Sequence, residues 1–115
     1  MPEPISHKLV HYTDDAGKDL FGHWLEALTD APTRATIAAR LLRLELGLFG
    51  DSKVIGDGLH ELRIDHGPGW RVYYGKQAGR IILLVAGSDK STQKASIKTA
   101  HARLANWNHR VESKN

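Results

Sequence analysis

The chain has 115 residues, which fits a single domain, because most domains hold about 100–150 residues and a chain of this length can bury one core. Hydrophobic residues make up 41% and charged residues 25%, a balance that excludes wholesale disorder and fibrous repeats. The chain has no cysteine, which excludes disulfides, thiolate metal sites and cysteine nucleophiles. We therefore expect one domain over residues 1–115, without a membrane or secretion signal, located in the cytoplasm.

The net charge of +3 is unevenly distributed along the sequence. Residues 1–58 carry six Lys and Arg against nine Asp and Glu, whereas residues 59–115 carry ten against four. The second half is therefore strongly basic. A fold that gathers this excess on one surface favours a polyanion such as nucleic acid as partner.

The first half predicts a strand followed by two helices. Residues 8–12 form a short alternating run that predicts an edge strand, and apolar residues at helical spacing predict a helix from about residue 15 to 28. Asp30 and Pro32 then begin a second helix over 33–48. We expect its polar side to be Thr33, Thr36, Arg40 and Arg43, and its covered side to be Ala35, Ala38, Ala39, Leu42 and Leu46. The two helices should form a hairpin, and the glycines of residues 47–58 predict a long connection.

The second half predicts three strands in a meander, over residues 59–65, 70–75 and 80–86, separated by turn-forming segments. Side chains alternate across a strand, so pairing the apolar faces leaves a polar set on the side away from the helical hairpin. That set comprises Glu61, Arg63, Arg71 and Tyr73. This face is the candidate functional surface.

A final helix follows residues 87–89, with Asp89 or Ser91 as its cap. Its docking stripe is expected to be Ile97, Ala100, Leu104 and Trp107. Lys90, Lys94 and Lys98 fall four residues apart and form a basic edge at its start, either as a solvated face or as an anion-binding site.

Common cofactor and hydrolase motifs are missing from the sequence. The seven histidines include no H-E-x-x-H motif, and there is no P-loop, no G-x-G-x-x-G and no G-x-S-x-G. We expect neither a metal nor a cofactor.

Three segments carry a family resemblance: G-L-H-E-L-R-I at 58–64, G-W-R-V-Y-Y at 69–74, and L-L-V-A-G at 83–87 running into D-K-S-T-Q at 89–93. Together they resemble the toxins of RelE/ParE-superfamily toxin–antitoxin modules, closest to the HigB-like "addiction module killer protein" branch. The resemblance covers roughly residues 8–107. It implies an α+β fold of order β-α-α-β-β-β-α, in which a small, mostly antiparallel sheet carries a helical hairpin on one face and a C-terminal helix. It also implies a protein antitoxin, in this branch typically of the helix-turn-helix type.

For RelE-like members, the resemblance implies metal-free cleavage of mRNA on the ribosome, by attack of a ribose 2′-hydroxyl on the adjacent phosphate. Arg71 matches the arginine of the family's glycine-aromatic-arginine motif, and Arg63 is expected as a second phosphate ligand. Arginine suits this role because it stays charged and presents a planar fork to phosphate oxygens. Lys90 matches a basic residue of the family, and Tyr73 could stack on a base or donate a proton. We expect Arg71 to be exposed. The expected catalytic residues are Arg71, Arg63, Lys90 and Tyr73, and the expected RNA-binding residues are Lys94, Lys98, Glu61 and Ser91.

The sequence departs from the best-known RelE pattern, which has closely spaced lysines on the strand that here carries Glu61, Arg63 and Asp65. Glu61 could replace the missing base, or it could be a structural partner that orients Arg63. Two other functions stay open: a ParE-like inhibitor of DNA gyrase, which acts through protein contact, and a binding relative without catalysis.

Overall fold

The computed structural model describes residues 5–113. The ends of the expected domain, residues 1–4 and 114–115, lie outside the described part. The elements in chain order are β1 (Lys8–His11), α1 (Leu20–Glu26), α2 (Ala31–Glu45), β2 (Ser52–Gly56), β3 (Leu59–Ile64), β4 (Trp70–Gln77), β5 (Ile81–Asp89), the short 3₁₀ helix η1 (Lys90–Thr92) and α3 (Gln93–Ser113).

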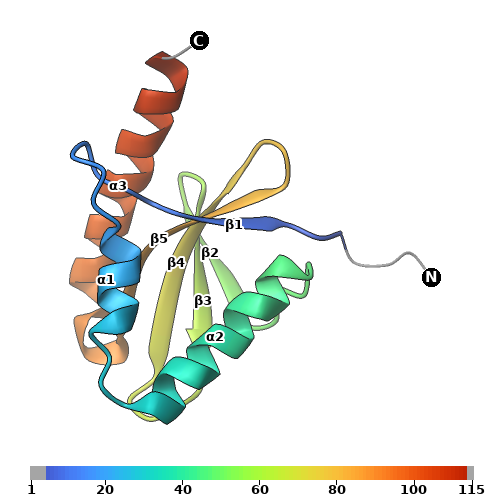
Figure 1. Ribbon diagram of the computed structural model, residues 1–115, viewed down its shortest axis with the longest axis vertical. Helices are drawn as coiled ribbons and strands as arrows, with labels where there is room; N and C mark the ends of the chain where they lie inside the picture. The colour runs from blue at the N-terminus through green and yellow to red at the C-terminus, as the bar shows by residue number, and fades with distance from the viewer. Residues whose placement is uncertain (1–4, 114–115) are drawn as a thin grey trace.

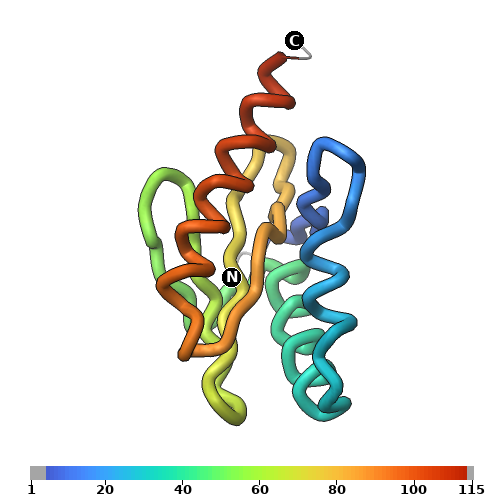
Figure 2. Tube along the Cα trace, turned by 90° about the vertical axis from the view of Figure 1, so that its left-hand side faces the viewer, coloured from blue at the N-terminus to red at the C-terminus, as the bar shows by residue number. Residues whose placement is uncertain are grey.

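The strands form one five-stranded sheet in the order β1-β5-β4-β3-β2. β1 pairs with β5 in parallel, and the other pairs are antiparallel. The helices α1 and α2 cover one face of the sheet and α3 crosses the other (Figures 1 and 2). The α+β class, the mostly antiparallel sheet, the helical hairpin and the C-terminal helix are confirmed, and β1 is an edge strand as predicted.

The prediction of an unbroken connection over residues 47–58 is wrong, because it contains β2. This strand pairs with β3, and a register of Gly56 with Leu59 leaves a two-residue turn between them. The turn residues Asp57 and Gly58 both have positive φ, 51° and 83°. Asp-Gly with positive φ at both positions is typical of a tight β-hairpin. The Asp57-Gly58 dipeptide is therefore a hairpin signal in the sequence, and the prediction of a long glycine-rich connection did not use it.

The bounds of both hairpin helices differ from the predicted ones: α1 is shorter at both ends, whereas α2 begins two residues earlier than predicted. The carboxylate of Asp19 accepts a hydrogen bond from the backbone N–H of Gly22, so α1 begins at Leu20 and not near residue 15. Asp30 caps α2 in the same way through the N–H of Thr33. α2 then ends at Glu45, three residues before the predicted end.

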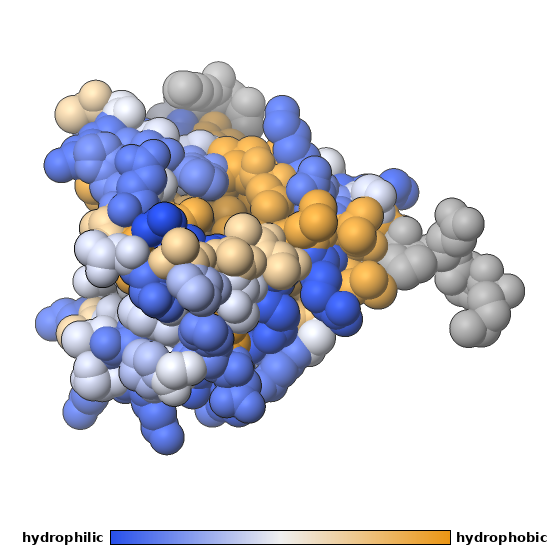
Figure 3. All heavy atoms as spheres, turned by 60° about the horizontal axis from the view of Figure 1, so that its bottom comes forward, coloured by the Kyte–Doolittle hydropathy of each residue, from blue (hydrophilic) through white to orange (hydrophobic). Residues whose placement is uncertain are grey.

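The predicted orientation of α2 is wrong. The buried side chains of the helix are Thr33, Ile37, Leu41 and Leu44, whereas Ala35, Ala38, Ala39, Leu42 and Leu46 are exposed. Ile37, Leu41 and Leu44 form a bulky apolar stripe at helical spacing, and this stripe buries more area than the alanine-rich side. Apolar side chains consequently appear among hydrophilic ones on the surface in Figure 3, which brings the lower side of Figure 1 forward.

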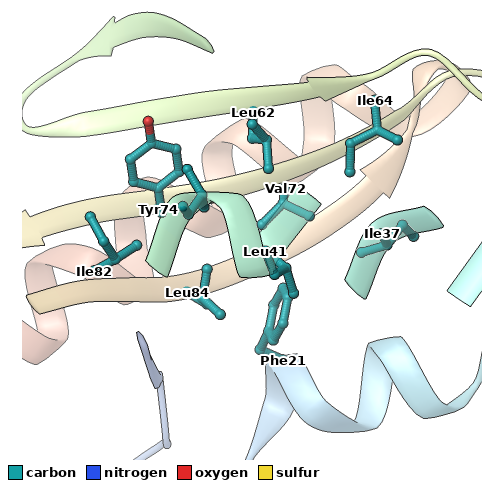
Figure 4. Close-up of a cluster of buried hydrophobic side chains, with 10 residues drawn as sticks. Phe21, Ile37, Leu41, Leu62, Ile64, Val72, Tyr74, Ile82 and Leu84 are labelled. Carbon is teal, nitrogen blue, oxygen red and sulfur yellow. The ribbon is translucent and has the colours of Figure 1, made fainter. Parts of the chain in front are cut away.

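The sheet has an apolar core on each face. On the hairpin side, Ile37 and Leu41 of α2 pack towards Leu62, Val72 and Leu84 of the sheet (Figure 4). On the other side, Ala100 and Leu104 of α3 cover a second cluster, and Ile97 and Trp107 pack against its margin. The predicted docking stripe of α3 is thereby confirmed. The sheet residues of the second cluster are Leu59, Tyr73, Leu83, Val85 and Ala86.

Adjacent leucines of α2 provide a direct test of its orientation. Leu41 is 7% exposed and Leu42 is 56% exposed. We predict that Leu41→Ala lowers the free energy of unfolding by about 2–5 kcal/mol, the cost of a cavity in a core. Leu42→Ala should change it by less than about 0.5 kcal/mol. Urea denaturation of both variants measures the difference, and equal losses would contradict this orientation.

Candidate functional site

Two arginines stand directly opposite each other in the sheet. Arg63 of β3 pairs with Arg71 of β4, and both side chains lie on the α3 face, as predicted from strand alternation. Like charges at directly opposite positions of an antiparallel pair repel each other. The arrangement therefore needs a compensating negative charge nearby.

Glu61 supplies that charge from beneath the two arginines. Its side chain is fully buried, and its Oε1 atom accepts a hydrogen bond of 3.2 Å from Arg63 Nε and lies 3.8 Å from Arg71 Nε. Its Oε2 atom accepts a 2.7 Å hydrogen bond from the amide of Gln93, the first residue of α3. A buried carboxylate is costly unless it is paired and hydrogen-bonded, and these three partners meet that requirement.

The outer ends of the arginines border a hollow of about 420 Å³. Its walls are Arg63, Arg71, Lys90, the turn of Gly67, Pro68 and Gly69, and the acidic residues Asp51 and Asp65. The walls thus carry three cationic side chains and two carboxylates, and the buried Glu61 adds a third carboxylate beneath Arg63 and Arg71. Such a site suits a single anionic group held between cations.

The glycine turn closes against the cations because of its backbone conformation. Gly69 has a φ of +84°, which L-residues with a side chain rarely adopt. A methyl group at this position would lie 3.6 Å from a terminal guanidinium nitrogen of Arg71 and 3.7 Å from Lys90 Cβ. These are ordinary contact distances, so the positive φ of the turn, and not a lack of space, favours glycine at this position.

Lys90 lies on η1, the short helix between β5 and α3. Asp89 caps this helix, as predicted, by accepting a 3.1 Å hydrogen bond from the N–H of Thr92. The Ser91 hydroxyl also donates to the Asp89 carboxylate, and these hydrogen bonds lower the pKa of Asp89, that of Ser91 contributing most. Ser91 is thus engaged within the turn. Lys94 and Lys98 are exposed further along α3 and are not among the residues that line the hollow.

Two residues expected at the site are buried below it. Tyr73 is fully buried under α3, and its hydroxyl lies 3.2 Å from Ser88 Oγ, within hydrogen-bond distance. Burial raises the pKa of the Tyr73 phenol, and the neighbouring Glu61 carboxylate adds to the rise. Tyr73 therefore cannot stack on a base here, and Glu61 has no exposed surface with which to bind RNA. Glu61 was considered as a base or as a structural partner of Arg63, and the structure contains the ion pair that the second role requires.

Arg71 is less accessible than expected, with 14% of its side chain exposed against 38% for Arg63. Its position in the sheet beside the 67–69 turn explains the difference. The sequence predicted a turn before Trp70, but it did not predict that this turn, Asp51 and Gln93 belong to the site. The G-P-G spacing directly before Trp70 was a signal for the turn, but no local pattern links Gln93 to Glu61, 32 positions earlier.

No group of three or more His, Cys, Asp or Glu side chains within residues 5–113 is arranged to hold a metal ion. In the same part of the chain, no helix is long and apolar enough to cross a membrane.

The fold and the hollow define a small α+β protein with a surface hollow lined by three basic side chains. An uncharacterized protein of Haemophilus influenzae is 49% identical to the chain over 80 residues, which are 70% of this chain and 81% of that relative. The chain belongs to the same family as this Haemophilus protein. No family model matches the sequence.

The buried pair of Tyr73 and Ser88 can be tested by a double-mutant cycle. Tyr73→Phe and Ser88→Ala should each lower the free energy of unfolding by about 1 kcal/mol, because each removes the same buried hydrogen bond. The double variant should cost little more than either single variant. Additive losses in urea denaturation would show that the two side chains do not interact.

Proposed function

We propose that the chain is the toxin of a toxin–antitoxin module, of the HigB-like branch of the RelE/ParE superfamily, and that it cleaves mRNA on the ribosome. The motif resemblance of residues 58–93 supports the family. The observation that carries the activity is the hollow between Arg63, Arg71 and Lys90. These three cations line one hollow, and in this proposal they bind one phosphodiester group of an RNA strand.

The reaction requires no covalent enzyme intermediate. The ribose 2′-oxygen attacks the adjacent phosphorus, the bond to the 5′-oxygen breaks, and the leaving 5′-oxygen takes a proton from water, so the products are a 2′,3′-cyclic phosphate and a 5′-hydroxyl. Negative charge grows on the phosphate oxygens in the transition state. The guanidinium groups of Arg71 and Arg63 stabilise this charge, and they do so without reorganising because Glu61 already holds them.

The proton of the 2′-hydroxyl passes to a base at the wall of the hollow. Lys90, Asp51 and Asp65 are titratable side chains in that wall, whereas Glu61 and Tyr73 lie buried beneath it. A site of this composition gives slow chemistry unless the RNA is held in an attack geometry. Orientation contributes about 7–11 kcal/mol to such reactions, and in this proposal the ribosome provides it.

The alternative of a gyrase inhibitor is less well supported. Inhibition through protein contact does not require a hollow that pairs three cations around one anionic group. The proposed partners are accordingly mRNA and the ribosome in the cytoplasm, together with a cognate antitoxin of the helix-turn-helix type that the family resemblance implies.

The experiment compares two arginine variants after induction without the antitoxin. Arg71→Ala should relieve growth arrest and slow cleavage of ribosome-bound mRNA about 10²- to 10³-fold, the usual loss when one transition-state donor is removed. Arg43→Ala, which removes the same charge from the exposed side of α2, should leave both unchanged. Mapping of RNA 5′ ends and growth curves measure the outcome.

Three results would contradict the proposal. They are full toxicity of a folded Arg71→Ala variant, efficient cleavage of free RNA that EDTA abolishes, and DNA breaks with intact messages. The last result would move the assignment to gyrase inhibition.

A further inference from the structure

Glu61 occupies a position that the chemistry of RNA cleavage alone does not explain. It is a fully buried carboxylate directly below a site for an anion, and its charge opposes the binding of phosphate. An apolar residue at this position would avoid the cost of burying a charge. Glu61 lies at the centre of polar contacts with Arg63, Arg71 and Gln93, which indicates that it holds these side chains in place.

The contacts of Glu61 fix the rotation of the guanidinium groups. Arg63 donates through Nε at 3.2 Å, and the Nε atom of Arg71 faces the same carboxylate oxygen at 3.8 Å. Because a guanidinium is planar, engaging its Nε side turns its terminal nitrogens away from the carboxylate. Arg71 Nη1 also donates a 3.0 Å hydrogen bond to the backbone carbonyl of Trp70, and the remaining terminal N–H groups of the two arginines are available at the hollow that they line.

The second carboxylate oxygen of Glu61 contacts the segment that carries Lys90, on another wall of the hollow. It accepts a 2.7 Å hydrogen bond from Gln93, which follows directly after η1 and begins α3. Lys90 stands on η1, so the start of α3 and its lysine are tied to β3 through the same carboxylate. One buried side chain thus connects all three cations of the hollow.

We propose that Glu61 is a positioning residue that orients Arg63 and Arg71 and, through Gln93, anchors the segment carrying Lys90. This inference rests on the proposed function, because it assigns a purpose to the hollow as an RNA-phosphate site. For the loss of the Glu61 charge, this inference predicts weaker RNA binding, whereas the charge of the site alone predicts stronger binding. Removing a negative charge near the hollow strengthens attraction for RNA, whereas releasing the arginines weakens binding.

The test uses Glu61→Gln, which keeps the shape of the side chain but removes its charge and one acceptor. Its matched control is Glu26→Gln, the same change at an exposed position of α1. The probe is a short single-stranded RNA with methylated 2′-hydroxyls, which binds without being cleaved. We expect Glu61→Gln to bind it about tenfold more weakly than the wild-type chain, the effect of about one lost charge-assisted hydrogen bond. Glu26→Gln should bind it as the wild type does.

A second measurement reports orientation without RNA. In the wild-type chain, the NMR signal of the Arg63 Nε–H group, which donates to Glu61, should be protected from exchange with water, and Glu61→Gln should abolish this protection. Equal or tighter RNA binding by a folded Glu61→Gln variant overturns the proposal. If that variant does not fold, the signal of the Arg63 Nε–H group in the wild-type chain decides. Free exchange of this group with water overturns the proposal, and protection supports it. A wild-type chain that binds no RNA contradicts the proposed function instead, and the NMR signal still decides the role of Glu61.

Discussion

The opposition of Arg63 and Arg71 across β3 and β4 is the constraint on which the site depends. Two guanidinium groups at paired positions repel each other, and the sheet tolerates them because Glu61 lies one pleat away on the same face. The carboxylate in turn can be buried because Gln93 occupies its second oxygen. The charge requirement of the sheet thereby also fixes where α3 begins.

The two faces of the sheet have different surroundings. The hairpin side holds the larger aliphatic core, and its helix α2 also reaches the site indirectly, because Arg40 donates a 2.8 Å hydrogen bond to the backbone carbonyl of Arg63. The α3 side is apolar under the middle of the helix and becomes polar where the helix begins. Arg63 is thus held at its backbone from one face and at its side chain from the other. Pre-organised donors of this kind are what stabilisation of a developing charge requires.

The sequence was most informative where the spacing of apolar and polar residues along a strand or helix determines which side chains share a face. Alternation along residues 59–65 and 70–75 predicted that Arg63 and Arg71 share a face, and the stripe of Ile97, Ala100, Leu104 and Trp107 predicted how α3 docks. It failed for α2, because both sides of that helix are rich in apolar residues and the period alone does not choose between them. It also failed for Tyr73, whose burial depends on the path of α3 over the sheet and on a contact with Ser88 fifteen residues away. Long-range packing leaves no local pattern, so these features required the three-dimensional structure.

The most direct test of the account is a crystal structure of the chain bound to single-stranded RNA with methylated 2′-hydroxyls. The account predicts a phosphodiester group in the hollow, with its oxygens within hydrogen-bond distance of the guanidinium groups of both Arg63 and Arg71, and with the Glu61 contacts unchanged. RNA bound along the exposed Lys94 and Lys98 edge of α3, with the hollow empty, would contradict it.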